Sequence, residues 1–269
     1  MAEKELIYLY CVTNKIPELK RNMKGVYFIY HEGLYAVVSK VPEDEFNEED
    51  IRKNLNDMEW LNTKVRLHEK LIEGVMKNNC LVPFKFATVF KSEQRMIAEI
   101  SEHEEELRDN LSYFEGNEEW GIKIYCDLPC LNNFLSREDE KILNMDKEIS
   151  SSTPGKAFFL KKRREEMINN MVFVYSQDFL DRLNKVSIHV CINRLLPKEV
   201  TCKNDEMILN TACFVNKKGR ETFLNMAYAI RTQYGRCGFS FDCTGPWPPY
   251  NFCNLPLERV QSGKKYQAV

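Results

Sequence analysis

Long apolar runs are missing from this 269-residue sequence, because none approaches the roughly 18 residues that a transmembrane helix needs. The opening stretch, Met1-Ala-Glu-Lys-Glu5, leads directly into a strand-like pattern. It has no basic region followed by an apolar one, which is the pattern of a secretory signal. We therefore expect a cytoplasmic protein without a membrane span.

Histidine is scarce, and cysteine lacks metal-binding spacing although it is frequent. The chain has four histidines and ten cysteines, and the closest cysteines, Cys126 and Cys130, do not form a Cys-x-x-Cys pair. This spacing disfavours a zinc site. A disulfide framework is not expected in a cytosolic chain of this size. Several cysteines instead alternate within strand patterns, as small buried hydrophobes do. We expect no metal and no cofactor.

The signatures of several enzyme classes are also missing. There is no Gly-x-Ser-x-Gly, no Walker A sequence and no Gly-x-Gly-x-x-Gly. His68-Glu69 resembles the start of a zinc-protease helix, but Ile72 stands where the second histidine is needed. His68 is therefore expected to be a hydrogen-bonded histidine in a core or an interface. The sequence predicts no catalytic residues and no enzyme.

An excess of one charge is absent too, since the net charge is −2, which argues against a nucleic-acid partner. The distribution is uneven: residues 1–118 hold 16 Lys and Arg against 23 Asp and Glu, and residues 119–269 hold 22 against 17. The two halves could attract each other or face different partners. A chance fluctuation of surface charge is an equally good interpretation.

Hydrophobic periodicity in the first part of the chain predicts a compact unit of strands and helices. Glu32-Gly33 is typical of a hairpin turn. The expected order is β-β-β-α-β-α: strands at 5–13, 25–31 and 34–41, a helix from 50 to about 77, a strand at 80–89 and a helix at 95–114.

The second part predicts a ferredoxin-like order, β-α-β-β-α-β, with an enlarged first crossover. The segment 148–155, EISSSTPG, is expected to be a mobile loop within that crossover. The expected elements are strands at 120–126, 187–194, 207–216 and 237–244, and helices at 131–143, 156–185 and 219–235.

The predicted fold class is therefore α+β with two domains. We expect an N-terminal α+β domain at 1–118, a ferredoxin-like C-terminal domain at 119–253 and a C-terminal tail at 254–269.

A basic run lies near the start of the long helix and contains Lys161, Lys162 and Arg163. One interpretation is a contact with an anionic surface or an acidic partner. The other is a solvated helix face that is balanced by the acidic residues Glu165 and Glu166.

The segment 245–252, GPWPPYNF, has three prolines and three aromatic residues. Proline excludes a helix interior and a central strand. We expect Trp247, Tyr250 and Phe252 to pack back onto the protein, against the other domain. A partner-binding role for the same aromatics is the alternative.

Four segments, in order, resemble the gas vesicle protein F/L family (GvpF/GvpL). They are the helix from Trp60 through His68-Glu69 with the following LVPFKFATVF (81–90), the stretch 111–125, PGKAFFLKKR (154–163) and GPWPPYNF (245–252). The second of these carries Gly116, Glu119, Gly121 and Lys123 in the family's pattern. In LVPFKFATVF, Ala87 replaces the usual glycine and Lys85 the commoner arginine.

The resemblance implies two α+β domains, the second ferredoxin-like, and a non-catalytic role as an assembly factor in gas vesicle formation. Such proteins are thought to bind the small hydrophobic shell protein (GvpA type) and to act with other gas vesicle accessory proteins. A gas vesicle location within the cytoplasm follows. A small-molecule-sensing ferredoxin-like regulatory protein, or an enzyme on that fold, stays open by fold analogy alone.

Overall fold

The computed structural model describes residues 4–18 and 25–253. The chain forms two compact units: one is Met1–Glu115 together with the segment that begins at Pro248, and the other is Gly116–Trp247. The expected domains were 1–118 and 119–253. In the structure, the segment after Trp247 belongs to the first unit rather than to the second. The expected tail, 254–269, lies outside the described residues. No helix of the described residues is long and apolar enough to cross a membrane.

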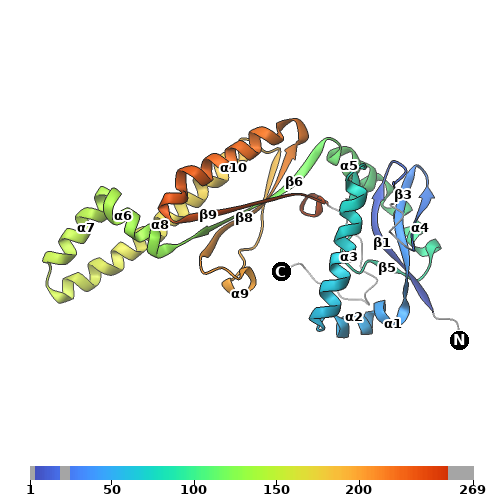
Figure 1. The fold of residues 1–269 in the computed structure, drawn as a ribbon, viewed down its shortest axis with the longest axis horizontal. Coiled ribbons are helices and arrows are strands. Elements are labelled where there is room, and N and C mark those ends of the chain that lie inside the picture. The colour runs from blue at the N-terminus through green and yellow to red at the C-terminus, as the bar shows by residue number, and fades with distance from the viewer. Residues whose placement is uncertain (1–3, 19–24, 254–269) are drawn as a thin grey trace. The chain divides into compact units, whose positions relative to one another are not determined.

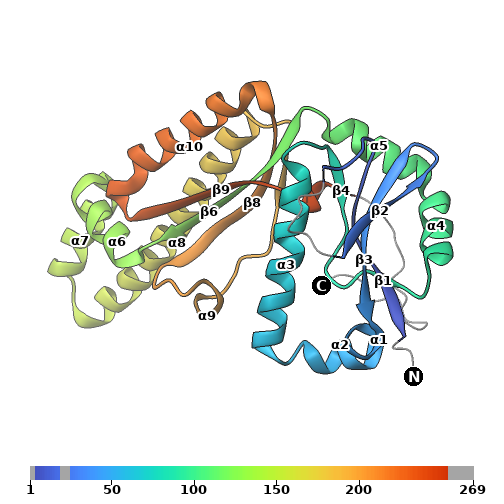
Figure 2. The same ribbon diagram turned by 45° about the vertical axis from the view of Figure 1, so that its right-hand side comes forward.

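The first unit is an antiparallel sheet with helices on both sides (Figures 1 and 2). Strand β1 (Glu5–Thr13) is central, and eight of its nine residues are buried. An inner strand covered on both faces has this pattern of continuous burial. The sheet order is β2 (Val26–His31), β3 (Leu34–Pro42), β1 and β4 (Leu81–Pro83), and β5 (Val89–Phe90) also pairs with β1.

The first unit's helices are shorter than the periodicity predicted. One helix from 50 to about 77 was expected, and the structure has α2 (Glu48–Asn54) and α3 (Met58–Met76) there, preceded by the short helix α1 (Glu43–Phe46). Side chains explain both breaks. The amide oxygen of Asn47 accepts the N–H groups of Glu49 and Asp50, and the Asp57 carboxylate accepts those of Glu59 and Trp60. Each side chain thus caps a new helix start.

The remaining segments of this unit also differ from the prediction. The expected helix at 95–114 is divided into α4 (Glu93–Glu102) and α5 (Glu104–Phe114), and His103 between them leaves helical geometry. The expected strand at 80–89 keeps only β4 and β5, because the chain between them turns at Ala87, where φ is +63°. The N–H of Ala87 donates to the Tyr8 hydroxyl oxygen at 2.7 Å instead of to a neighbouring strand.

In the second unit the sheet order is β7 (His189–Ile192), β8 (Glu206–Asn216), β6 (Asn117–Cys126) and β9 (Phe239–Trp247), all antiparallel. With β6 first and β9 last in the chain, this is the ferredoxin-like order. Alternate residues of β6 face one core, which also contains Phe179 of α8 (Pro154–Asn184) and Phe223 of α10 (Arg220–Tyr234). The two long helices therefore cover the same face of the sheet. Each fully buried phenylalanine contributes about 2–3 kcal/mol.

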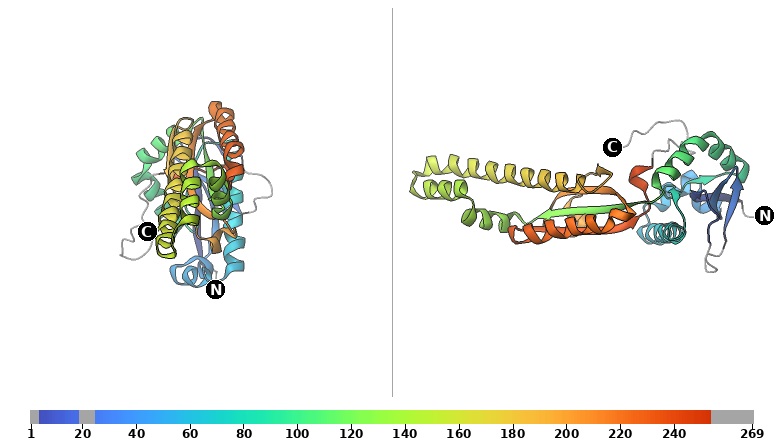
Figure 3. Two further views of the ribbon diagram at one scale, coloured as in Figure 1. Left: turned by 90° about the vertical axis from the view of Figure 1, so that its left-hand side faces the viewer. Right: turned by 90° about the horizontal axis from the view of Figure 1, so that it is seen from above.

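The enlarged crossover consists of helices almost throughout. Helices α6 (Leu128–Glu138) and α7 (Glu140–Ser151) replace the single short helix expected at 131–143, and the Asp139 carboxylate caps α7 through the N–H of Ile142. The segment 148–155 is not the expected loop: α7 continues to Ser151, and α8 begins at Pro154. Proline suits the first helical position, so the break is short. Helix α7 runs beside the first part of α8 (Figure 3).

The remaining elements are short. They are α9 (Lys198–Thr201) and the single-turn 3-10 helices η1 (Lys217–Gly219), η2 (Gly235–Cys237) and η3 (Tyr250–Phe252).

Ala87 offers a test of the backbone at this turn. Its φ of +63° lies in the left-handed region, which costs an L-residue about 1–2 kcal/mol relative to glycine. We expect Ala87→Gly to raise the free energy of unfolding by up to about 1 kcal/mol, even after the greater entropy of the unfolded glycine chain is counted. Urea unfolding measures this change.

Ala36, buried within β3, is the matched control. Ala36→Gly should lower stability by about 1 kcal/mol, because glycine weakens a strand interior. A loss of stability in both variants would show that the turn at Ala87 is unstrained.

Candidate functional site

The C-terminal segment joins the core of the first unit. After Trp247, Pro248 and Pro249 are buried, and the single turn η3 follows. Tyr250 packs against the cluster that contains Tyr8 and Tyr10, and Phe252 is buried as well. Proline limits the conformations of this short segment, so the aromatic side chains enter the core at a small entropic cost.

Four side chains form a hydrogen-bonded group that we call the His68 cluster: Tyr8, His68, Glu69 and Tyr250. The Tyr8 hydroxyl lies 3.0 Å from His68 Nδ1, and the Tyr250 hydroxyl lies 3.1 Å from His68 Nε2. The Tyr250 hydroxyl also donates to Glu69 Oε1 at 3.3 Å. Tyr8 lies 60 positions before His68 in the sequence and Tyr250 lies 182 positions after it, yet both contact the same imidazole ring.

The direction of one hydrogen bond orders the others. Because the Tyr250 hydroxyl donates its proton to Glu69, its contact with His68 requires a proton on Nε2. A neutral His68 then accepts the Tyr8 proton at Nδ1, and the Tyr8 oxygen accepts the N–H of Ala87. Every group in the chain of hydrogen bonds is satisfied, as buried polar groups require.

Burial controls the titration of the cluster. It lowers the pKa of His68 to about 4, and the nearby backbone of Phe84 opposes this only in part. Burial likewise raises the pKa of Tyr8, Tyr250 and Glu69 above their ordinary values. Desolvation disfavours the charged form, so burial favours a neutral His68 between two neutral tyrosines.

The cluster does not have the geometry of a reaction centre. His68 is only 2% exposed, and both ring nitrogens are engaged by tyrosine hydroxyls. A general base needs access to the proton that it removes, and His68 has none. Within residues 4–18 and 25–253, no group of three or more His, Cys, Asp or Glu side chains could hold a metal ion. The arrangement joins β1, α3 and η3.

The His68 pKa predicts a pH dependence of stability. The pKa of His68 in the folded protein is lowered from 6.5 to about 4. Between these two pH values His68 is therefore protonated in the unfolded chain but not in the folded one. The stability of the protein should therefore decrease as the pH falls from about 6.5 to about 4, by roughly 3 kcal/mol for this group. Urea midpoints across this range measure the slope.

The variant His68→Gln should lose this part of the slope, whatever its stability at pH 7. The matched control His189→Gln removes an exposed histidine of β7 and should keep the slope. Identical pH profiles for wild type and His68→Gln would contradict the assignment.

Trp247 lies in the second unit, outside the His68 cluster. It was expected to pack onto the protein, but much of its side chain is exposed. It ends β9 in the second unit and is 40% exposed. Its indole N–H donates to Thr244 Oγ1 at 3.0 Å, and the ring nitrogen lies close to the position that a Cβ at Gly121 would take. Proline on both sides holds Trp247 in extended backbone at the end of β9.

The basic run on α8 separates into two kinds of residue. Lys161, Lys162 and Arg163 are exposed, and Phe158 and Phe159 beside them are 67% and 72% exposed. Arg164 is different. Its guanidinium bonds to Asp146 at 2.6 Å and also to Asn132 and Ser136. Arg164 therefore holds α6, α7 and α8 together.

The partly buried contacts of Arg164 and the exposure of its neighbours predict different effects of substitution on stability. Arg164→Gln leaves Asp146 without its charged partner in a half-buried position, and we expect a loss of about 2 kcal/mol in unfolding free energy. The control Lys162→Gln alters an exposed side chain of the same run and should change stability by less than about 0.5 kcal/mol. Equal losses would contradict the structural role of Arg164.

Of the residues that the sequence singled out, His68 and Tyr250 meet directly, and Phe252 lies in the same unit. Trp247, Lys161, Lys162 and Arg163 belong to the second unit. Tyr8 and Glu69 were not predicted as members of the cluster. The only signal for Glu69 was its place beside His68, and the role of Tyr8 depends on strand pairing that brings β1 to α3.

Comparison with known proteins agrees with this architecture. The family model described as "Gas vesicle synthesis protein GvpL/GvpF" matches residues 6–254. The chain belongs to the GvpL/GvpF family. It is 23% identical to gas vesicle protein L of Streptomyces sp. (strain CB03234) over 97% of both chains. It is 24% identical to gas vesicle protein F1 of Halobacterium salinarum over 97% of this chain and 99% of that protein.

Solved structures of GvpF show the same fold. The structure from Anabaena sp. PCC7120 superposes with a TM-score of 0.70 at 16% identity, covering 93% of this chain and 99% of that one. The structure from Microcystis aeruginosa gives a TM-score of 0.64 at 19% identity with the same coverage. The predicted α+β class is confirmed, and so is the resemblance to this family. All four segments that carried the resemblance lie within the GvpL/GvpF match.

Proposed function

We propose that this protein is a non-catalytic accessory protein of gas vesicle formation that binds the hydrophobic shell protein of GvpA type and assists its nucleation or assembly. The observation that carries the proposal is the family match across residues 6–254, which includes both units. The proposal places the protein in the cytoplasm, at the gas vesicle, among other gas vesicle accessory proteins.

Physical chemistry supports this role. A shell subunit with an apolar face exposes that face, and its strand edges, before assembly, and both promote aggregation. A binder that covers them needs no acid, base or metal. The described residues offer a buried, fully hydrogen-bonded His68 rather than an accessible one, which favours a binding protein over an enzyme.

The exposed part of α8 is a proposed contact surface. Phe158 and Phe159 lie beside Lys161, Lys162 and Arg163, so apolar and cationic groups share one stretch of helix. Such a surface suits an acidic protein partner with some apolar area. Trp247, which is 40% exposed at the end of β9, is a separate candidate for an aromatic contact with a partner.

The direct test is co-purification. We expect the affinity-tagged chain to retain the shell protein when both are expressed together, and a tagged ferredoxin-like protein of unrelated function to retain none. A strain without this chain should form no vesicles or misshapen ones and should lose flotation, and the intact gene should restore it. Normal flotation of the deletion strain together with no retained shell protein would overturn the proposal.

A further inference from the structure

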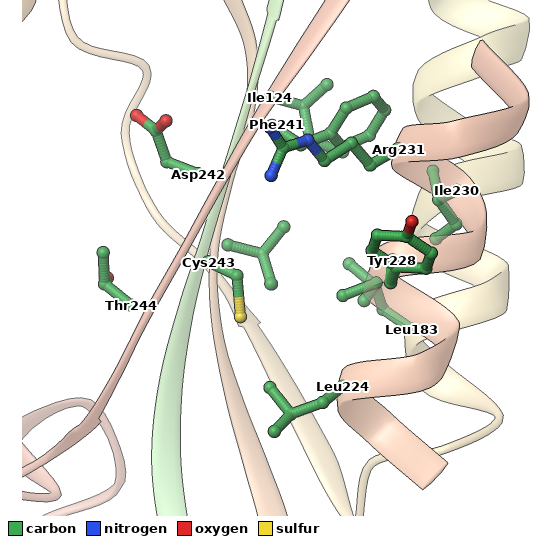
Figure 4. A pocket seen from close by; sticks show the side chains of 12 residues that line it. Ile124, Leu183, Leu224, Tyr228, Ile230, Arg231, Phe241, Asp242, Cys243 and Thr244 are labelled. Carbon is green, nitrogen blue, oxygen red and sulfur yellow. The ribbon is translucent and has the colours of Figure 1, made fainter. Parts of the chain in front are cut away.

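A groove of about 340 Å³ lies in the second unit between α10 and the edge strand β9. Its floor is formed by Ile122 and Ile124 of β6 and by Leu183 of α8, and Leu224 and Ala227 of α10 form one wall. Figure 4 shows Ile124, Leu183 and Leu224 directed into the space between α10 and β9. The groove has room for a few apolar side chains, and its lining is mainly apolar.

The groove lies next to a long, open sheet edge. Strand β9 has nine residues and pairs only with β6 among the described strands, whereas β7 at the other end of the sheet has four residues. Proteins usually protect edges by shortness, charge or proline. Here Pro246 stands only near the end of the strand, so the backbone before it can accept another strand.

The register shows which groups face outward. The N–H of Asp127 donates to the Gly238 carbonyl at 2.8 Å, which makes these two residues a hydrogen-bonded pair. Such pairs alternate along an antiparallel ladder, so Ser240 and Asp242 direct their backbone groups toward β6. The backbone N–H and C=O groups of Phe241 and Cys243 therefore point away from the sheet.

The side chains of Phe241 and Cys243 line the groove. Residues that face each other in a hydrogen-bonded pair carry their side chains on the same face of a sheet. A strand added beside β9 would thus bond to the backbone of Phe241 and Cys243 and place the facing side chains under α10. Backbone bonds would supply affinity, and the groove would select apolar residues at alternate positions.

The charges at the groove favour a carboxylate in the occupant. Arg231 extends from α10 toward the sheet in Figure 4 and makes no ion pair within the described part of the chain. Asp242, the other charged residue at the groove, is paired with Lys203 at 2.7 Å. An acidic residue of the added strand would therefore meet an available cation.

We propose that the edge of β9 and the groove beneath α10 bind one extended segment of the shell protein as an additional strand, with apolar residues at alternate positions and an acidic residue near Arg231. This inference rests on the proposed function and names the binding site for it.

A pair of variants at Cys243 tests the proposal. Cys243→Pro removes the outward N–H at an edge position where proline is tolerated, and Cys243→Ala keeps that N–H. We expect Cys243→Pro to bind the shell protein about tenfold more weakly than Cys243→Ala, because both variants lose the thiol and only the proline also loses the N–H. Ala227→Leu fills the groove without touching the edge backbone and should weaken binding to a similar extent. Circular dichroism and melting temperature confirm folding.

Hydrogen exchange of the wild-type protein provides a readout that needs no variant. The amide protons of Phe241 and Cys243 should exchange quickly in the free protein and slowly with the shell protein bound. Those of Ser240 and Asp242 should be slow in both states.

If the shell protein binds but neither these amides nor the two weakening variants respond, the strand site is wrong and the accessory function stands. If no variant and no wild-type protein retains shell protein, the accessory function fails and the strand site fails with it.

Discussion

The Tyr250 hydroxyl lies 3.1 Å from Nε2 of a histidine that the chain placed 182 residues earlier. This contact brings the end of the described chain into the first unit, so the second unit, Gly116–Trp247, is an insertion with both of its ends attached to the first. An unpaired hydroxyl or imidazole in this core would cost about 1–3 kcal/mol, because neither could recover its hydrogen bonds with water. The His68 cluster therefore favours one position of the C-terminal segment in the core of the first unit.

Insertion has a consequence for the second unit. Its first strand, β6, and its last, β9, are neighbours in the sheet, so the points at which the chain enters and leaves lie on adjacent strands. The same topology puts β9 at the edge, because a ferredoxin-like order leaves the last strand outermost. The edge that we propose for partner binding is thus a product of the fold, and its openness depends on α10 leaving Cys243 exposed.

Predictions from periodicity succeeded where one face of an element is buried. The strands at 5–13 and 206–216, and the long helix that begins at Pro154, lie within a few residues of their expected positions. Predictions failed where side chains compete with the backbone. Asp57 and Asp139 cap new helices inside segments that were each expected to be one helix. Ala87 broke an expected strand because its N–H bonds to Tyr8, and no local pattern contains that partner.

The sequence alone determined the fold class and the family, and it predicted that His68 is a hydrogen-bonded histidine of a core or an interface, since apolar spacing, motif order and the missing second histidine are all local properties. Only the tertiary structure decided that Tyr8, Glu69 and Tyr250 surround that histidine, that Arg164 differs from the cations beside it, and that an edge strand borders an apolar groove. Each of these depends on which distant segments pack together, and strand pairing and helix packing are interactions between residues that lie far apart along the chain.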